Sequence, residues 1–231
     1  MEWLLDYYNY RIVGQYLDQL AYGFGQTLFA AGLSLILSIT IGLVLALMRL
    51  SKHGIFWRPV SAYIEFIRAT PLLVQIYIIY YGLPSLFPST ARWNELWPGI
   101  IALSLHTAAY MAEIIRAGIV SVPKGQIEGA KSVGMTYTQR LRYIILPQAF
   151  ANVLPPLLGQ TAVLVKDTSL LSIITVFEIM SAGLLINSER VKPNESFLTI
   201  AACYLVIYVA LLGLSHLIKT YLAGPAWNAK R

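Results

Sequence analysis

Charged side chains are scarce in this sequence. They make up 12% of its 231 residues, whereas hydrophobic side chains make up 57% and the mean hydropathy is +0.63. Soluble globular proteins carry about 25% charged residues, and half that density cannot cover the surface of a water-soluble protein of 25.7 kDa. The composition therefore predicts a membrane protein, and its net charge of +6 has to be interpreted by position.

Cysteine and the common catalytic motifs are also missing. Cys203 is the single cysteine, so a disulfide framework and a multi-cysteine metal site are excluded. The sequence contains no His-Glu-x-x-His, no paired Asp motif and no Gly-x-Ser-x-Gly. Residues 125–132 superficially resemble a phosphate-binding loop, but Ala130 stands where that motif needs glycine before Lys131. We therefore expect no catalytic residue, no metal site and no ATP bound by this chain.

Long runs without charge predict the spanning helices, each of which needs about 20 apolar residues. We expect Pro147 and the pair at 155–156 to break the fourth run. A sixth apolar stretch, 169–186, contains Glu178 and is predicted to be a shorter helix or re-entrant piece buried against protein. The predicted fold is an all-α membrane protein, with residues 1–231 as a single transmembrane domain. Its five expected spans contain residues 28–48, 72–83, 96–115, 143–165 and 197–218.

Basic residues predict the orientation of these spans. Only Arg11, Arg92, Arg190 and Lys192 fall on the segments of the opposite side. Because basic residues concentrate in cytoplasmic segments, we expect the N-terminus outside and the C-terminus in the cytoplasm. The positive charge then reports topology and not affinity for nucleic acid. The residues assigned to the cytoplasm are Arg49, Lys52, Arg58, Arg68, Arg116, Lys124, Lys131, Arg140, Arg142, Lys219, Lys230 and Arg231.

Residues 121–147, between the third and fourth runs, predict two short helices. Pro123 can open the first, and Gly134 suits the left-handed position that ends a helix. Thr136 and Gln139 fit a capping box that starts the second. One face of the first helix carries mostly small side chains, so it could dock against a cytoplasmic partner. An ordinary cytoplasmic loop is an equally good interpretation of the residues alone. That face consists of Ile127, Ala130, Lys131 and Gly134.

This segment also carries a spaced pattern that resembles the EAA loop of ABC importer permeases. That loop has the form E-A-A, three residues, G, nine residues, I-x-L-P, and every spacing matches. Gly129 replaces the usual second alanine with another small residue. The resemblance implies that the segment is a coupling helix pair seated in a cleft of an ATP-hydrolysing subunit. The matching residues are Glu128, Gly129, Ala130, Gly134, Ile144, Leu146 and Pro147.

Further stretches resemble the polar amino acid permeases of this family, with Ala69 where glycine is usual. The resemblance implies a five-helix type I importer permease of the bacterial inner membrane. It also implies a dimer with a second copy or a homologous permease, two ABC ATPase subunits that carry ATP and Mg, and an extracytoplasmic amino acid-binding protein. The matching stretches are 45–51, 68–75, 110–114, 121–126, 146–149 and 166–170.

Lys166, Asp167 and Thr168 are candidates for the translocation path. A charged side chain at the bilayer centre costs roughly 2.5–3.5 kcal/mol, so it usually faces a cavity or a partner. These residues could meet the carboxylate or amine of an amino acid. The structural alternatives are a local ion pair, or capping of a helix that begins near Thr168.

Other polar side chains near the spans are weaker candidates for the path. Gln160 forms either an interhelical hydrogen bond or a substrate contact. His106, Tyr110 and Glu113 share one helical face, and we expect His106 to be a buried core residue and Glu113 to pair with Arg116 or Arg68. Three more candidates lie at the start of the second run. A purely structural role explains them equally well, because Pro71 is a typical first residue of a helix. These three are Arg68, Thr70 and Gln75.

The leading hypothesis is the permease subunit of an ATP-driven, binding-protein-dependent importer of polar amino acids, of the histidine, glutamate, glutamine, arginine, lysine or cystine type. It would work by alternating access coupled to a separate ATPase. The alternatives are a permease for another small solute, an integral-membrane enzyme, or a small channel or carrier without an ATPase. The sequence leaves open which amino acid is carried and whether the dimer is of identical chains.

Overall fold

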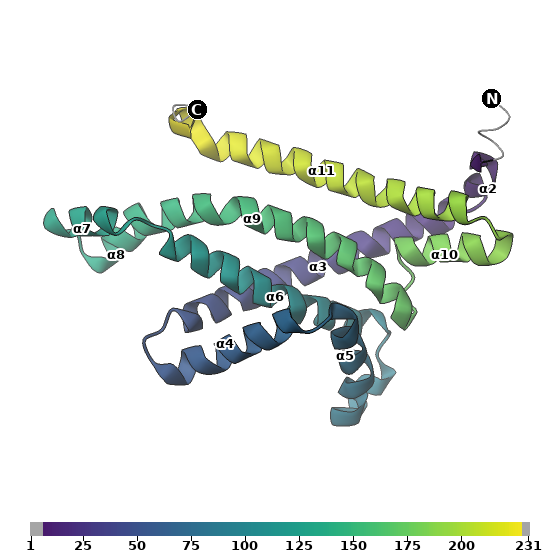
Figure 1. Cartoon of the computed structure of the whole chain (residues 1–231), viewed down its shortest axis with the longest axis horizontal. Coiled ribbons are helices and arrows are strands. Elements are labelled where there is room, and N and C mark those ends of the chain that lie inside the picture. Colours follow the sequence, from purple (N-terminus) through teal and green to yellow (C-terminus); the bar gives the residue numbers. More distant parts are fainter. Residues whose placement is uncertain (1–6, 228–231) are drawn as a thin grey trace. The chain divides into compact units, whose positions relative to one another are not determined.

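The computed structural model describes residues 7–227, with side chains up to residue 218. All regular structure in this part is helical, as Figure 1 shows, which confirms the all-α prediction. Of the basic residues used for orientation, Lys230, Arg231 and the side chain of Lys219 lie outside the described part.

The α-helices are α2 (Tyr10–Gly14), α3 (Leu17–Arg49), α4 (Gly54–Ala69), α5 (Leu72–Leu86), α6 (Leu96–Val120), α7 (Lys124–Ser132), α8 (Tyr137–Arg140), α9 (Leu146–Asp167), α10 (Ile179–Arg190) and α11 (Pro193–Trp227). Shorter elements are the 3₁₀ helices η1 (Pro88–Arg92) and η3 (Thr168–Ile174), and the π-helical segment η2 (Leu141–Ile145).

Within the described residues, four helical stretches are long and apolar enough to cross a membrane. They are Leu17–Arg49, Leu96–Val120, Tyr137–Ile174 and Pro193–Ile218. The pair α4 and α5 makes a fifth if it counts as one broken span. This agrees with the five predicted spans, and the predicted shorter piece at 169–186 is confirmed as η3 and α10.

The fourth span differs from the prediction at its prolines. Helix α9 continues through Pro155 and Pro156, which were expected to break it. Both prolines are exposed, as are Ala151 and Asn152, whose carbonyls lose their helical donors. The irregular part is η2, which ends just before Leu146 and Pro147.

Contacts between Cα atoms divide the chain into two compact units. Unit 1 contains the chain up to Ile36, Thr70–Ser104 and Ala162–Leu211, and unit 2 contains Leu37–Ala69, Leu105–Thr161 and the chain from Leu212. Helices α3, α6, α9 and α11 contribute residues to both. The single transmembrane domain over residues 1–231 stays a prediction.

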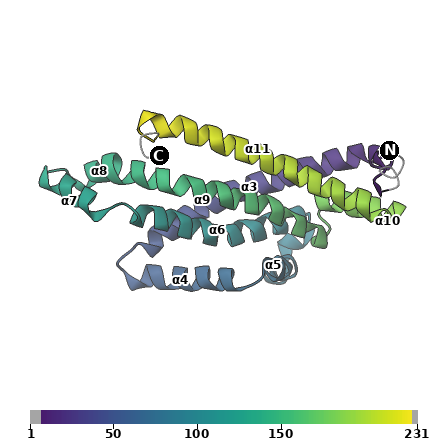
Figure 2. The same ribbon diagram turned by 45° about the horizontal axis from the view of Figure 1, so that its top comes forward.

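Unit 1 is held together by close helix contacts and an aliphatic core. Helix α10 lies beside the first part of α11 in both Figure 1 and Figure 2. A Cβ atom on Gly183 of α10 would lie 2.1 Å from Ile200 Cδ1 of α11, so the Ile200 side chain fills the space that a larger residue at position 183 would need. The core of this unit includes Ile76, Ile100, Leu103, Leu164, Leu171 and Ile174.

Unit 2 contains α4, a helix that the charge-free runs did not predict. Its apolar face packs on the parts of α3 and α6 in this unit, where Gly42 of α3 leaves room for Met111 of α6. A Cβ on Gly42 would lie 2.6 Å from Met111 Cβ, so any larger residue would separate the two helices. The buried residues of α4 are Val60, Ile64 and Ile67.

Candidate functional site

The coupling-loop candidate, residues 121–147, folds locally as predicted. Helix α7 begins directly after Pro123 and ends at Ser132, and Gly134 follows its C-cap residue Val133 with a φ of +78°. The amide of Met135 donates to the Ala130 carbonyl at 3.1 Å and the amide of Gly134 donates to the Lys131 carbonyl at 3.0 Å. These two bonds form a Schellman motif, which satisfies carbonyls at the helix end.

The second helix of the loop begins with the expected capping box. The Thr136 amide donates to Gln139 Oε1 at 2.8 Å, and the Gln139 amide donates to Thr136 Oγ1 at 3.4 Å. Arg140 Nη1 donates to the Met135 carbonyl at 2.6 Å and closes the turn between α7 and α8. The loop is therefore a defined pair of helices, built from hydrogen bonds within the segment itself.

The predicted small face of the loop is only partly exposed, because Lys131 and Gly134 are exposed and Ile127 is half-buried. Ala130 is only 6% exposed and therefore faces the protein, so it cannot form the middle of a docking face. Instead Val133 is 75% exposed and Tyr137 is 68% exposed, beside the exposed Glu128 and Gly129. Large apolar side chains left in solvent are typical of an interaction surface.

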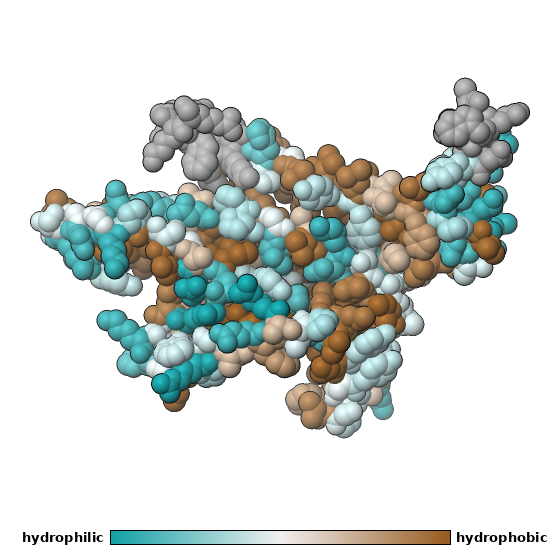
Figure 3. Space-filling view, viewed as in Figure 1, coloured by the Kyte–Doolittle hydropathy of each residue, from teal (hydrophilic) through white to brown (hydrophobic). Residues whose placement is uncertain are grey.

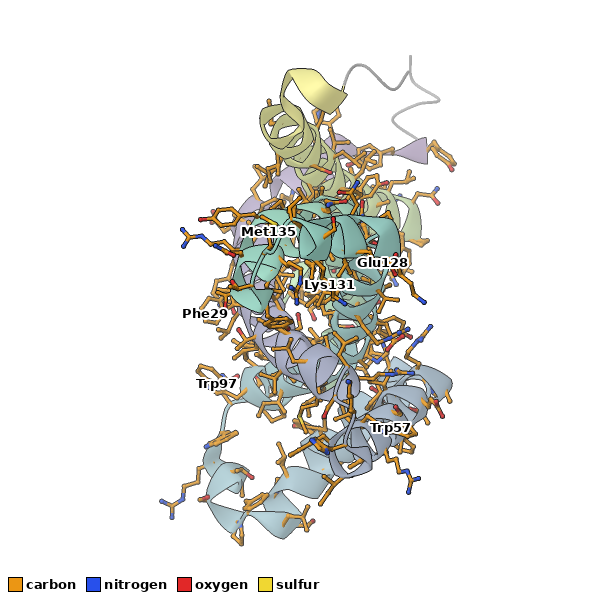
Figure 4. All side chains as sticks on the ribbon, turned by 90° about the vertical axis from the view of Figure 1, so that its left-hand side faces the viewer. Phe29, Trp57, Trp97, Glu128, Lys131 and Met135 are labelled. Atoms are coloured by element: carbon orange, nitrogen blue, oxygen red, sulfur yellow. The ribbon has the colours of Figure 1, made fainter. Side chains whose placement is uncertain are left out.

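Two figures place this surface on the loop. Figure 4 looks onto α7 and α8, and Glu128, Lys131 and Met135 lie at the front of that view. In Figure 3 hydrophilic residues gather over α7 and α8, while hydrophobic patches follow α11. A polar helix pair with exposed Val133 and Tyr137 suits contact with a water-soluble partner.

The remaining residues of the pattern start α9. Leu146 is 49% exposed and Pro147 is exposed as well. The Ile144 carbonyl accepts a hydrogen bond from Gln148 Nε2 at 2.9 Å. This side-chain bond satisfies a carbonyl where η2 meets α9, so it stabilises the junction of the loop with the fourth span.

The loop connects α6 to α9, and these two helices pack very closely in unit 2. Asn152 Nδ2 of α9 donates to Ser121 Oγ, just past α6, at 2.8 Å. A Cβ on Gly118 of α6 would lie 2.0 Å from Val153 Cγ2 of α9 and 3.2 Å from the Ala149 carbonyl oxygen. The two helices that flank α7 and α8 are therefore in close contact with each other.

A polar cluster in unit 2 contains three of the predicted path residues. The ring centroids of His106 and Tyr110 are 5.1 Å apart, and the Arg68 guanidinium lies 5.5 Å from the Tyr110 ring centroid. His106 is 8% exposed, as expected for a core histidine. Arg68 was one of two predicted partners of Glu113, and it contacts the Tyr110 ring instead.

Glu113 instead joins two arginines of unit 2. It forms ion pairs with Arg49 of α3 and with Arg116 of α6, the latter at 3.1 Å between Glu113 Oε2 and Arg116 Nη2. The predicted pair with Arg116 is thus confirmed. Since Glu113 is 19% exposed, its charge is partly shielded from water, and its loss would leave two cations without their acid.

Replacing Glu113 by glutamine is expected to lower the free energy of unfolding by about 1–2 kcal/mol, because two charge-assisted hydrogen bonds are weakened. Arg116→Gln should cost less, since Glu113 keeps its bond to Arg49. Thermal unfolding of the purified variants in detergent measures both effects. Equal stability of Glu113→Gln and the wild-type chain would contradict this role.

The candidates at the start of α5, in unit 1, serve its architecture. Gln75 is 6% exposed, and its Nε2 donates to the Thr70 carbonyl at 3.1 Å and to Thr70 Oγ1 at 2.8 Å. Pro71 is the N-cap residue of α5, as the sequence predicts. Gln75 therefore fixes the first turn of α5, and a role in substrate contact stays a prediction.

Lys166, Asp167 and Thr168 lie where α9 passes into η3 in unit 1. Thr168 is fully buried, Asp167 is half-buried and the Lys166 side chain is exposed. Among the residues with described side chains, the two charges form no direct ion pair, and the Asp167 side chain makes no capping bond to η3. Neither structural alternative is therefore seen, and the path role stays a prediction.

Gln160 is half-buried in the unit 2 part of α9. Within the described part of the chain its side chain makes no interhelical hydrogen bond. No group of three or more His, Cys, Asp or Glu residues in that part could hold a metal ion. Each unit thus holds its own candidates: Arg68, His106, Tyr110 and Gln160 in unit 2, and Thr70, Gln75 and Lys166 to Thr168 in unit 1.

Comparison with known proteins gives a consistent result. Residues 38–223 match the family described as binding-protein-dependent transport system inner membrane component. The probable amino-acid permease protein YxeN of Bacillus subtilis is 42% identical over 200 residues, which cover 86% of this chain and 89% of that protein. The probable glutamine ABC transporter permease protein GlnM of the same organism is 38% identical over 198 residues, covering 85% and 90%. A chain from the crystal structure of an amino acid ABC transporter with histidines matches with a TM-score of 0.83 and 35% identity, covering 90% of this chain and 96% of that one.

Proposed function

The chain belongs to the family of binding-protein-dependent transport system inner membrane components, and from this premise we propose that it is the permease of an ATP-driven importer of polar amino acids. It is a multi-pass protein of the inner membrane. The observation that carries the proposal is the loop of residues 121–147, an exposed helix pair within the matched region. Its predicted docking residues include Glu128 and Gly129, which are exposed.

The proposed substrate class rests on the named relatives. YxeN is described as a probable amino-acid permease protein and GlnM as a probable glutamine transporter permease. The matching solved structure is that of an amino acid ABC transporter. An amino acid with a polar side chain is therefore the proposed cargo, and the binding protein that delivers it sets much of the selectivity.

The proposed mechanism is alternating access. ATP and Mg bind to two partner ATPase subunits, and closure of those subunits moves α7 and α8. Because α6 and α9 touch at Gly118 and Val153, both spans move with the loop and the path opens toward the loaded binding protein. Hydrolysis resets the permease, which has no catalytic role itself and works as a dimer with a second copy or a homologous chain.

The experiment is to purify the chain with its ATPase subunit and to measure ATP hydrolysis with the binding protein. Loaded binding protein is expected to raise the hydrolysis rate, with thermal-shift screening of that protein identifying the amino acid. Binding protein without amino acid is the control. A chain that binds no ATPase, or a complex that no amino acid stimulates, would favour a channel or a carrier.

The orientation proposed from the basic residues places Lys52 in the cytoplasm and Arg92 outside. With Cys203 replaced by serine, a membrane-impermeant thiol reagent on intact cells should label Arg92→Cys and spare Lys52→Cys. The reverse pattern would overturn the orientation.

A further inference from the structure

Glu178 is a buried carboxylate that none of the proposed steps uses. It lies between the candidate spans Tyr137–Ile174 and Pro193–Ile218 and is fully buried in unit 1. Its Oε2 accepts from the Met180 amide at 2.9 Å and from the Tyr204 hydroxyl at 2.7 Å, and its Oε1 accepts from the Ser181 amide at 2.9 Å. Glu178 is thus the N-cap of α10 and is also bonded to α11.

The chemistry of this site favours a carboxylate over an amide. The three groups that bond to the Glu178 oxygens act as donors, so an acceptor-only side chain matches all of them. Burial raises the pKa of the Glu178 carboxyl, whereas hydrogen bonds from Tyr204, Met180 and Ser181 lower it. Glutamine would point an NH₂ group at one of these donors, so it would lose at least one bond.

The start of α10, at Glu178 and Ile179, also contacts α3. A Cβ on Gly23 would lie 2.8 Å from the Glu178 carbonyl oxygen, so the α3 backbone touches the peptide of Glu178 directly. The Ile179 amide donates to Thr27 Oγ1 of α3 at 3.2 Å, and Thr27 is fully buried. The start of α10 is therefore held by α3 on one side and by α11 on the other.

A series of hydrogen bonds extends this cluster to η3, which begins next to the candidate path residues. Ser181 Oγ donates to the Val176 carbonyl at 2.7 Å, and the Val176 amide donates to the Leu171 carbonyl of η3 at 3.2 Å. Thr168 is the first residue of η3 and directly follows Asp167. The chain turns back after η3 at Thr175, whose φ of 66° is unusual for a residue with a branched side chain. Bonds from outside the turn are needed to hold such a corner.

We propose that Glu178 is a positioning residue for translocation. Through Ser181 and Val176 it fixes η3, whose first residue directly follows Asp167, relative to α3, α10 and α11. The inference rests on the proposed function, because it assigns Glu178 to the path that those residues are proposed to line. If η3 and the start of α10 were no longer held in place, the ATPases would hydrolyse ATP without moving a substrate.

The test uses the complete complex in proteoliposomes, with amino acid uptake and ATP hydrolysis measured together. Tyr204→Phe removes one hydroxyl and keeps the ring, and Glu178→Gln keeps the size of the side chain. Each is expected to lower the number of amino acids transported per ATP roughly tenfold, the factor expected when a charge-assisted hydrogen bond is lost. The double variant should be no worse than the poorer single variant, because the two groups act as one unit.

Two controls separate positioning from stability. Tyr208→Phe removes a hydroxyl from an exposed tyrosine one turn further along α11 and should leave the ratio unchanged. Gly183→Ala destabilises the contact of α10 with Ile200 without touching Glu178. Unfolded complex neither transports nor hydrolyses, so Gly183→Ala should lower both rates and leave their ratio unchanged.

The outcomes distinguish this inference from the proposed function. If the wild-type complex shows no ATP-driven uptake, the proposed function itself falls. If the wild type transports and Tyr204→Phe and Glu178→Gln keep its ratio, or lower it only as much as Gly183→Ala does, then Glu178 is a structural cap and not a positioning residue.

Discussion

A permease carrying Glu128→Arg is expected to lose most of its ATP-driven uptake while it still inserts and folds. Glu128 is exposed, and within the described part of the chain its side chain makes no hydrogen bond or ion pair. Folding therefore does not depend on it. Coupling between two sites is typically worth about 1–3 kcal/mol, so we expect uptake to fall roughly 10- to 100-fold because the reversed charge and added bulk block docking of the ATPase.

Two further variants make this result specific. Ser89→Arg adds the same side chain at an exposed position in η1, outside residues 121–147, and should leave uptake within about twofold of wild type, the usual scale of surface substitutions. Gly134→Arg should uncouple as well, but it also strains a backbone with φ of +78°, and Gly134→Asn separates the two effects because asparagine tolerates that conformation. Undiminished uptake by Glu128→Arg would refute the coupling assignment.

Gly118→Ala is expected to destabilise the chain strongly, although it adds only one methyl group. The new Cβ would lie 2.0 Å from Val153 Cγ2, so α6 and α9 would have to separate. Overpacking of this kind costs about 1–3 kcal/mol, which corresponds to a Tm roughly 2–12 °C lower for a chain of this size. Thermal unfolding in detergent is the measurement.

A second substitution should repair this defect. Val153→Ala removes the methyl groups that collide, so the Gly118→Ala/Val153→Ala double variant should recover most of the lost Tm. Gly159→Ala is the matched control in α9, because nothing lies within 4 Å of its Cβ position and alanine favours a helix. A Gly118→Ala variant as stable as Gly159→Ala would mean that the two helices are not in close contact.

Local signals in the sequence predicted much of this structure. Charge-free runs found the long helices, and Pro123, Gly134 and Thr136 gave the boundaries inside the coupling loop because each acts on its own backbone. Helix α4 was not predicted, because its apolar residues alternate with Arg58, Pro59 and polar residues and form no continuous apolar run. Its packing face becomes visible only when α3 and α6 are placed against it.

Predictions that depended on distant residues were less successful. Glu113 bonds to Arg49, which is 64 positions away, and no local spacing points to that pair. Helix α9 continues through Pro155 and Pro156, where a break was predicted, and Ala130 of the predicted docking face is buried. The Glu178 cluster depends on Thr27, 152 positions before Ile179, so the sequence showed only an acid in an apolar stretch.

The most direct measurement is uptake of radiolabelled amino acid into proteoliposomes that contain the chain with its ATPase. Uptake should require ATP and loaded binding protein together, and should fall to background when the ATPase is inactivated. Uptake that continues without ATP or without the ATPase would contradict the assignment of this chain as the permease of an ATP-driven importer.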